Sequence, residues 1–567
     1  MSTPVRIAGM PLLFLIACFF LGKMPVLCAQ KPPLKKYWVT FTDKKNTPYC
    51  TCRPAEFLSA RSIARRQRAN VPISEEDLPV DPAYIQALRD KGAQWHSTSR
   101  WLNAAAVIAD STTAARLRDL AFVTKVEYIG KHIYPKNPPN RPVKKRGVWA
   151  SYPKAGDKAP VFGYAARQNA ALGMPYLYWA GHRGAGIWVA VMDGGFVNVD
   201  TMPFFDSTAL QARLFPGWDF VERDGAVFES AQHGTSVLSV MAANLPGYFV
   251  GTAPDATYFL LKTEDTGGEF PVEETNWIAG AEWADSVGVD IINASLGYTS
   301  FNDNTLSHRY RELDGRTAIG SRGAAIAAQK GMIVCNSAGN SGDEPWRYIG
   351  VPADAPGIVA VGATGDEGKR ASFSSVGPSA DGRIKPELVA PGDQVVTAGY
   401  SGTSLGVSSG TSLASPMLAG AIASLWSAYP EKTAAEILDA VFRSADQYTA
   451  PDPLRGYGLP DMVKAWFALG GFSNGDSNND AGSGLFAYHR DQGTLSFIVF
   501  GALPGGIESV RLCNALGQAQ PIGAFRLQQN RIATLTIEGL SDLPPGAYRV
   551  QVCGKEGVLG LRGVMWR

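Results

Sequence analysis

The stretch Gly186-Ile187-Trp188-Val189-Ala190-Val191-Met192-Asp193-Gly194-Gly195 decides the fold of this chain of 567 residues. Its apolar run is bounded by glycines, which predicts a buried strand of a parallel sheet. Asp193 stands at the carboxyl end of this strand, and functional sites of open α/β sheets form at that edge. The alternative is an aspartate that only begins a turn before two glycines.

Strand and helix patterns alternate on both sides of this stretch. We expect strands to end at Asp193, Ile292, Val334 and Val361, and helices over Val272–Asp285, Gly323–Gln329 and Ala434–Arg443. Such alternation predicts a doubly wound, mostly parallel α/β sheet with helices on both faces. Right-handed crossovers would then bring residues that are distant in sequence to one edge of the sheet.

Two further segments carry side chains suited to that edge. Ser412 lies in Gly410-Thr411-Ser412-Leu413-Ala414-Ser415-Pro416, directly before an apolar helical stretch, so we expect its hydroxyl at a helix N-terminus with Pro416 in the first turn. His233 opens a second helix of small and apolar residues. Taken singly, such a serine is a helix cap and such a histidine is a surface residue. With Asp193 they supply a nucleophile, a general base and an orienting carboxylate.

These motifs resemble those of the subtilisin-like serine proteases (the subtilase family) over about residues 175–465. The segments that also match are Asn293–Gly297, Ser337–Asn340, Phe373–Pro378 and Lys385–Gly392. His233 followed by Gly-Thr argues against the sedolisin relatives, which carry an acidic residue there.

The resemblance implies a role for each residue of the site. Ser412 would be the nucleophile, His233 the general base and acid, and Asp193 the orienting carboxylate. Asn340 would donate to the oxyanion of the tetrahedral intermediate. The segments placed beside the substrate are Ser295, Leu296 and Gly297, which would pair with its backbone, and Ser337, Ala338 and Gly339, which would wall the specificity pocket.

The N-terminal third of the chain predicts a secreted zymogen. Residues 1–29 have Arg6, a short apolar stretch and a Leu-Cys-Ala ending, typical of a secretory signal, with a retained membrane anchor as the alternative. Residues 30–135 show a βαβαβ-like order that resembles the α+β, ferredoxin-like prodomain of subtilases, an inhibitor and folding chaperone; a plain adhesive domain is the alternative. The Pro-rich, basic region 136–174 predicts a linker that is cut during maturation.

The C-terminal part predicts a separate β domain. Residues 471–484 are rich in Gly, Ser, Asn and Asp and predict a flexible linker. Residues 485–567 show short strands and turns, typical of a small β-sandwich. This segment resembles the sorting domain of the type IX secretion system, which would make the secretion machinery a partner; a generic binding sandwich is the alternative.

Cysteine content and charge limit the remaining function classes. The five cysteines after the signal lack metal-type spacing, so no metal site is predicted. We expect Cys335 to be a buried free thiol, Cys513 and Cys553 to be able to pair, and Cys50 and Cys52 to be too close for a routine disulfide. A net charge of +2 gives no indication of nucleic-acid binding.

The sequence therefore predicts an enzyme of the cell surface or the exterior. We expect a serine endopeptidase that acts on proteins or peptides, is inhibited by its own prodomain and requires no cofactor; the resemblance allows calcium, but no dense acidic loop indicates it. A catalytically inactive surface protein with the same fold is the main alternative. An esterase is a weaker one, because the chain lacks a Gly-x-Ser-x-Gly elbow.

Overall fold

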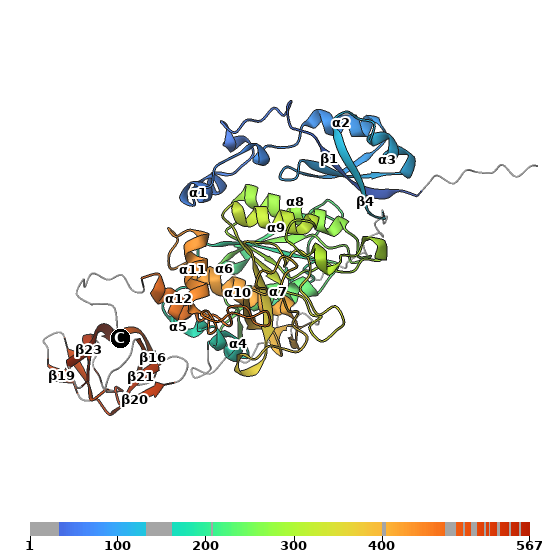
Figure 1. Cartoon of the computed structure of the whole chain (residues 1–567). Helices are drawn as coiled ribbons and strands as arrows, with labels where there is room; N and C mark the ends of the chain where they lie inside the picture. The colour runs from blue at the N-terminus through green and yellow to red at the C-terminus, as the bar shows by residue number, and fades with distance from the viewer. Residues whose placement is uncertain are drawn as a thin grey trace, which may run out of the picture.

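The computed structural model describes residues 33–131, 161–205, 208–399, 404–470 and, with short gaps, 484–566. The predicted signal 1–29, residues 136–160 of the predicted maturation region and residues 471–483 of the predicted linker lie outside the described residues. Figure 1 shows an N-terminal unit above α8 and α9 of the central body, and a C-terminal β unit beside α5 and α12.

The central body is built on a seven-stranded parallel sheet. Its strand order is β13-β12-β11-β10-β5-β9-β6, with bounds Leu388–Pro391, Val359–Thr364, Ile333–Ser337, Ile291–Ala294, Trp188–Asp193, Thr257–Lys262 and Leu214–Asp219. β5 ends at Asp193, as predicted. β10, β11 and β12 run two or three residues past their predicted ends, because buried polar residues such as Asn293 and Asn336 continue the pairing where the apolar pattern stops.

Helices cover both faces of this sheet, which confirms the doubly wound α/β fold. Val189 and Val191 of β5 belong to the core with α7 (His233–Ala242), α10 (Thr411–Trp426), α11 (Ala434–Ser444) and α12 (Met462–Ala468). Ala190 and Met192 belong to the opposite core with α8 (Val272–Val287) and α9 (Ile319–Gln329). This alternation along β5 follows the two-residue period of a strand. The short helices α4 (Ala166–Ala171), α5 (Met174–Trp179) and α6 (Thr208–Gln211) complete the body.

The N-terminal unit is an antiparallel sheet with two helices. Its order is β2-β3-β1-β4, with bounds Gln94–Ser99, Ala104–Ala109, Lys35–Phe41 and Val123–Lys131. The helices α2 (Pro82–Asp90) and α3 (Ser111–Leu117) complete a βαββαβ order. The predicted βαβαβ order was therefore one strand short, because the polar sequence of β2 gave no strand pattern. With β2 included, the unit has the ferredoxin-like arrangement.

One face of the N-terminal sheet packs on α2 and α3, and the opposite face packs on the central body. Trp38, Trp101 and Leu102 share one apolar cluster with Trp277 and Ala281 of α8. A long connection, residues 42–81 between β1 and α2, leaves the sheet and places α1 (Ala60–Arg68) near the far end of α8 (Figure 1). We call residues 42–81 the arm.

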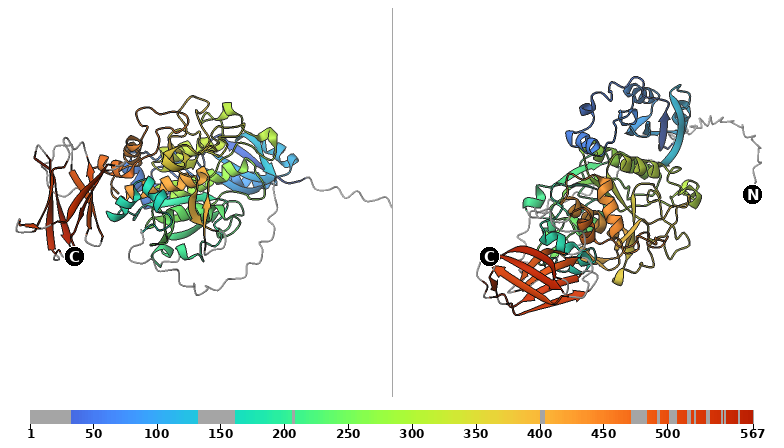
Figure 2. Two further views of the ribbon diagram at one scale, coloured as in Figure 1. Left: turned by 90° about the horizontal axis from the view of Figure 1, so that it is seen from below. Right: turned by 60° about the vertical axis from the view of Figure 1, so that its left-hand side comes forward.

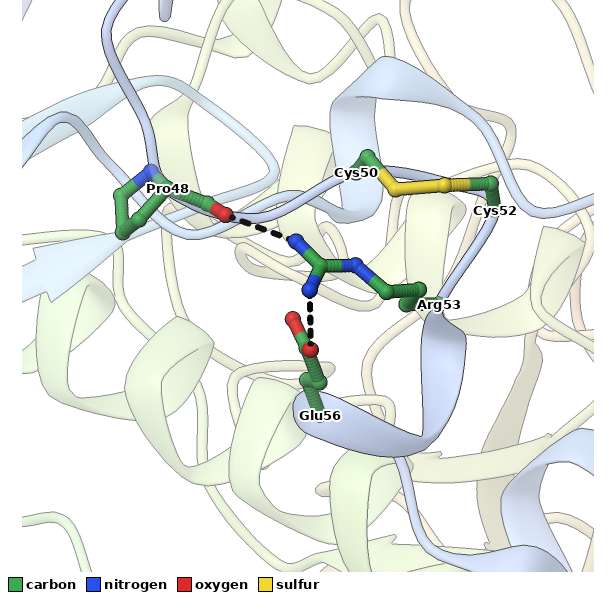
Figure 3. The surroundings of a disulfide bond; sticks show 5 residues. All are labelled: Pro48, Cys50, Cys52, Arg53 and Glu56. Atoms are coloured by element: carbon green, nitrogen blue, oxygen red, sulfur yellow. Dashed lines mark hydrogen bonds and ion pairs between the residues drawn. A yellow bond between two sulfur atoms is a disulfide. The ribbon is translucent and has the colours of Figure 1, made fainter.

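The arm contains the disulfide Cys50–Cys52, whose Cα atoms are 5.2 Å apart (Figure 3). The expectation that these cysteines are too close in sequence for a routine disulfide is corrected, since they are bonded and their Cα separation lies within the usual range for a disulfide. Arg53 beside the pair contacts the carbonyl oxygen of Pro48 and the carboxylate of Glu56 (Figure 3).

The C-terminal unit forms two four-stranded antiparallel sheets around one apolar core, as a β-sandwich does. The sheet orders are β16-β17-β21-β20 and β19-β18-β22-β23, and the strand bounds are Gly484–Asp491, Thr494–Phe500, Ala533–Glu538, Ala524–Gln529, Ala519–Gln520, Ser509–Asn514, Gly546–Gly554 and Gly557–Trp566. Figure 2 shows this unit to one side of the central body.

Three cysteines of the described residues are free thiols. Cys335 is a buried free thiol, as predicted, and burial raises its pKa. Cys513 and Cys553, which the sequence left able to pair, are both free: the register of β18 and β22 places Cys513 opposite Arg549 and Cys553 opposite Ser509. Within the described ranges, no helix combines the length and apolar character that crossing a bilayer requires.

Candidate active site

Asp193 and His233 form a hydrogen-bonded pair at the carboxyl edge of the sheet. Nδ1 of His233 lies 2.8 Å from Oδ2 and 3.0 Å from Oδ1 of Asp193. Asp193 is 1% exposed and also accepts the N–H of Gly194, whereas the His233 side chain is 46% exposed. The charge of Asp193 raises the pKa of His233 above its usual 6.5, against the opposing effect of burial. Asp193 therefore orients the imidazole through Nδ1, and the rest of the ring is partly exposed.

This close approach of α7 to β5 requires a glycine after His233. A Cβ on Gly234 would lie 2.3 Å from the carbonyl oxygen of Gly195 and 2.9 Å from Cβ of Asp193. Contacts this short do not occur between real atoms of these types, so any larger residue would push the helix, and His233 with it, away from Asp193.

Ser412 is the second residue of α10, which begins at Thr411 after the cap residue Gly410. Its partly exposed side chain stands at the positive end of the helix, as the sequence predicted. Pro416, however, lies in the second turn and not in the first as expected, because the helix starts earlier than the apolar pattern.

Pro416 leaves one carbonyl of α10 without its helical partner. Because proline has no N–H, the carbonyl oxygen of Ser412, four residues earlier, receives no helical hydrogen bond from it. The hydroxyl of Ser295 donates to this oxygen at 2.8 Å. Asn293 in turn donates to Ser295 and accepts the hydroxyl of Ser415. A buried polar network therefore fixes the backbone of Ser412.

Asn340 lies at the start of α10, where its amide oxygen is bonded to Thr411, the residue before Ser412. Its Oδ1 accepts the N–H of Thr411 at 2.8 Å and the Thr411 hydroxyl at 2.9 Å. A Cβ built on Gly410 would lie 2.9 Å from Oγ of Ser412 and 3.7 Å from Nδ2 of Asn340. The two groups thus flank the same small space, where an oxyanion could accept from Nδ2 and the Ser412 N–H.

Some of the residues expected to contact substrate instead support the site from within, and others are exposed. Ser295 faces Ser412, as described above, and Ser337 donates its hydroxyl to the carbonyl oxygen of Leu296. Ala338 is fully buried with Tyr298 and Ile349, so its side chain faces the core. Gly339 has a positive φ of 111° and donates its N–H to Thr411. Gly297 is exposed and Leu296 partly so; these two remain candidates for pairing with a substrate backbone.

A group of three glutamates near the pair was not predicted from the sequence. One carboxylate oxygen each of Glu264, Glu269 and Glu273 lie within 4.8 Å of one another, an arrangement that could hold a cation. Glu264 accepts the Tyr298 hydroxyl, and Glu273 accepts two backbone N–H groups. Burial raises the pKa of Glu264 to about 8 and that of Glu273 to about 10, and it also raises the pKa of Glu269, so burial favours the protonated, neutral form of these carboxyl groups. Their spacing along a loop and a helix start gave no metal motif.

His233 and Ser412 stand on two helices that begin at the same edge and pack on one another. Among the described residues, no hydrogen bond joins the imidazole to the hydroxyl. Such bonds are often long without substrate and tighten in the Michaelis complex. The arrangement offers an oriented base, an alcohol at a helix N-terminus and an amide donor for an oxyanion, which is the equipment of acyl transfer.

Sequence comparisons agree with this chemistry. A model of the Subtilase family matches residues 184–459, and one of the Peptidase S8 propeptide domain of Bacteroidota matches residues 36–145. Subtilisin NAT of Bacillus subtilis subsp. natto is 32% identical over 51% of this chain and 68% of that protein. Subtilisin of Bacillus pumilus is 32% identical over 51% of this chain and 94% of that protein. Serine protease AprX of Bacillus subtilis is 27% identical over 48% of this chain and 63% of that protein. The chain therefore belongs to the subtilase family and is a subtilisin-like serine endopeptidase.

Proposed function

We propose that this protease cleaves peptide bonds through Ser412, His233 and Asp193. Oγ of Ser412 attacks the carbonyl carbon while Nε2 of His233 takes its proton, and Asp193 holds the tautomer and stabilises the imidazolium. The oxyanion accepts hydrogen bonds from Nδ2 of Asn340 and the N–H of Ser412. His233 then protonates the leaving amine, and water hydrolyses the acyl-enzyme by the same steps in reverse order.

The observation that carries this proposal is the double contact of His233 Nδ1 with Asp193. It leaves Nε2 as the free nitrogen of the ring on the exposed side. An inactive binding protein would have no use for a buried carboxylate that orients an imidazole in this way.

Peptide hydrolysis by the purified protein tests the assignment. The mature enzyme should digest a peptide library, and Ser412→Ala should lose all but a residual activity, with an unchanged circular dichroism spectrum. Equal turnover by both proteins would reject Ser412 as the nucleophile. The mechanism needs no cofactor, so we expect activity to survive EDTA.

The N-terminal unit is proposed to be the inhibitory prodomain of a zymogen. Its support is the apolar face that it packs on α8 and the match to an S8 propeptide. The predicted linker 136–174 was too long, because residues 161–174 fold onto the central body with α4. We therefore propose cleavage between about residues 132 and 160, where an accessible connector is expected, and export with the help of the signal and the C-terminal unit. N-terminal sequencing of the secreted wild type and of Ser412→Ala tests export and self-processing. An N-terminus near residue 30 in the mutant, together with a later N-terminus in the wild type, would indicate that the protein is exported and cleaves itself.

A further inference from the structure

The arm binds the C-terminal end of α8. The last carbonyls of a helix lack intrahelical partners and carry the negative end of its dipole. In α8 the arm supplies the donors: the N–H of Ser59 donates to Ser286 at 2.9 Å, the Ser59 hydroxyl to Val287 at 2.7 Å, and Nε of Arg61 to Gly288 at 3.0 Å.

Charged side chains make the same contact. Asp285, fully buried near the end of α8, pairs with Arg66 at 2.7 Å and with Arg65, both from the arm. It also pairs at 2.6 Å with Arg100, from the turn between β2 and β3. Arg65 and Arg66 are themselves 2% and 1% exposed. Beside them Asp290 pairs with Arg61.

A complementary contact of opposite sign lies at the end of α9. Lys330 of the central body pairs with Glu76 at 2.7 Å and with Asp77 at 3.0 Å, both from the arm. Arm and body therefore match charge for charge, and isolated charges buried on either side would be costly.

The helix of the arm and the N-terminal sheet differ in the apolar side chains that they bury. The sheet packs Trp38, Trp101 and Leu102 into an apolar cluster, whereas α1 buries Ser62, Arg65 and Arg66 and no apolar side chain. A helix as short as α1 is marginal alone in water. The ionic surface therefore contributes to the order of α1.

The surface lies at the opposite edge of the sheet from the candidate active site. Arg61 also donates to the carbonyl oxygen of Gly186 at 2.9 Å, just before β5 begins at Trp188. Asp193 ends the same strand, about 20 Å away at the rise of a parallel strand. The arm consequently contacts the body without approaching Ser412.

We propose that the C-terminal end of α8, with Asp285 and Asp290, is an exosite for an arginine-rich helical segment, and that the arm is its ligand. The exosite holds the prodomain on the enzyme after the chain is cut, separately from the contacts that block the active site. This inference rests on the proposed role of the N-terminal unit as an inhibitor. Two linked contacts dissociate far more slowly than either one, because each keeps the other at a high effective concentration.

The release rate of a cut prodomain tests the exosite. A protease recognition sequence is inserted within residues 136–160 of the full chain carrying Ser412→Ala, the chain is cut, and dissociation is followed by size-exclusion chromatography. Arg65→Gln with Arg66→Gln should speed release about 30-fold or more, since removing one partner of a buried charge pair acts on dissociation. Gln67→Ala, an exposed change on the same helix, should leave the rate unchanged.

Two further measurements keep the test decisive. If the double variant does not fold, Arg61→Gln, whose side chain is 35% exposed, should still give a smaller acceleration. A peptide of residues 59–77 at about 1 mM should also speed release by competition, whereas the same peptide with both arginines replaced by glutamine should not. Wild-type release rates for the arginine variants, or no effect of the peptide, would overturn the exosite. Because the readout is binding in an inactive chain, the result is independent of whether Ser412 is the nucleophile.

Discussion

The hydroxyl of Ser295 donates to the carbonyl oxygen of Ser412 at 2.8 Å, in the place of the helical hydrogen bond that Pro416 cannot make. The candidate nucleophile is thus held by a neighbouring strand end and not by its own helix alone. This explains how a proline can stand in the second turn of α10 without leaving the Ser412 carbonyl unsatisfied.

We predict that Ser295→Ala lowers both stability and turnover. Loss of the donor leaves the Ser412 carbonyl without a partner, which costs about 1–3 kcal/mol of unfolding free energy, and frees the backbone that positions Oγ. The matched control is Ser424→Ala, which removes a buried bond from the same helix to Thr252. Both variants should lose stability in urea titrations, but only Ser295→Ala should lose kcat. Equal kcat values would mean that Ser295 is only structural.

Asn340 is predicted to act on the transition state. Asn340→Ala should reduce kcat about 10²–10³-fold with little change in KM, the usual effect of removing one oxyanion donor. Thr411→Val keeps the backbone N–H that holds Asn340 and loses the two bonds of the hydroxyl, to Asn340 and from Gly339, so its kcat should fall much less. Steady-state kinetics on one peptide substrate compares the two. An increase in KM alone for Asn340→Ala would assign Asn340 to ground-state binding.

The acid limb of the activity profile should report His233. Its pKa is raised above 6.5, chiefly by the charge of Asp193, and only the neutral imidazole accepts the proton of Ser412. Activity should therefore rise with pH through a midpoint above 6.5. Asp193→Asn should move this midpoint down and reduce kcat about 10⁴-fold. Measurement of kcat/KM against pH for both proteins checks this, and an unmoved midpoint would show that another group titrates.

Glu264 should make the folded protein less stable as pH rises. Burial raises its pKa from 4.5 to about 8, so the folded state binds more protons than the unfolded state between these values. The unfolding free energy contributed by this group therefore falls as pH rises from about 4.5 to about 8. Glu264→Gln removes this titration while Oε1 can still accept from Tyr298. Its stability relative to the wild type, measured in the Ser412→Ala background, should increase between about pH 5 and pH 8; a constant difference would contradict the raised pKa.

The sequence predicted most of the elements that apolar periodicity marks. β5, α8 and the part of α10 that follows Ser412 agree with their patterns, because each contains many buried apolar residues. The strand β2 and the arm escaped prediction, since the side chains of Gln94–Ser99 are mostly polar and α1 buries arginines. Those residues are ordered by partners such as Asp285 that lie far away in the sequence.

The site shows the same division. Asp193, His233, Ser412 and Asn340 were predicted from their motifs. The structure places them at one edge of the sheet, with His233 bonded to Asp193 and Asn340 bonded to Thr411, the neighbour of Ser412. Their catalytic roles stay predictions until tested. The second-turn position of Pro416 and the Glu264 cluster could not be predicted, because both depend on where a helix begins and on which loops meet.

Covalent labelling with a fluorophosphonate tests the central claim most directly. These reagents react with a serine whose proton is taken by a neighbouring base, so mass spectrometry of the labelled mature protein should place the adduct on Ser412 alone. Labelling should vanish in Ser412→Ala and slow by orders of magnitude in His233→Ala. An adduct on another residue, or an unlabelled mature protein that still cleaves peptides, would contradict the assignment.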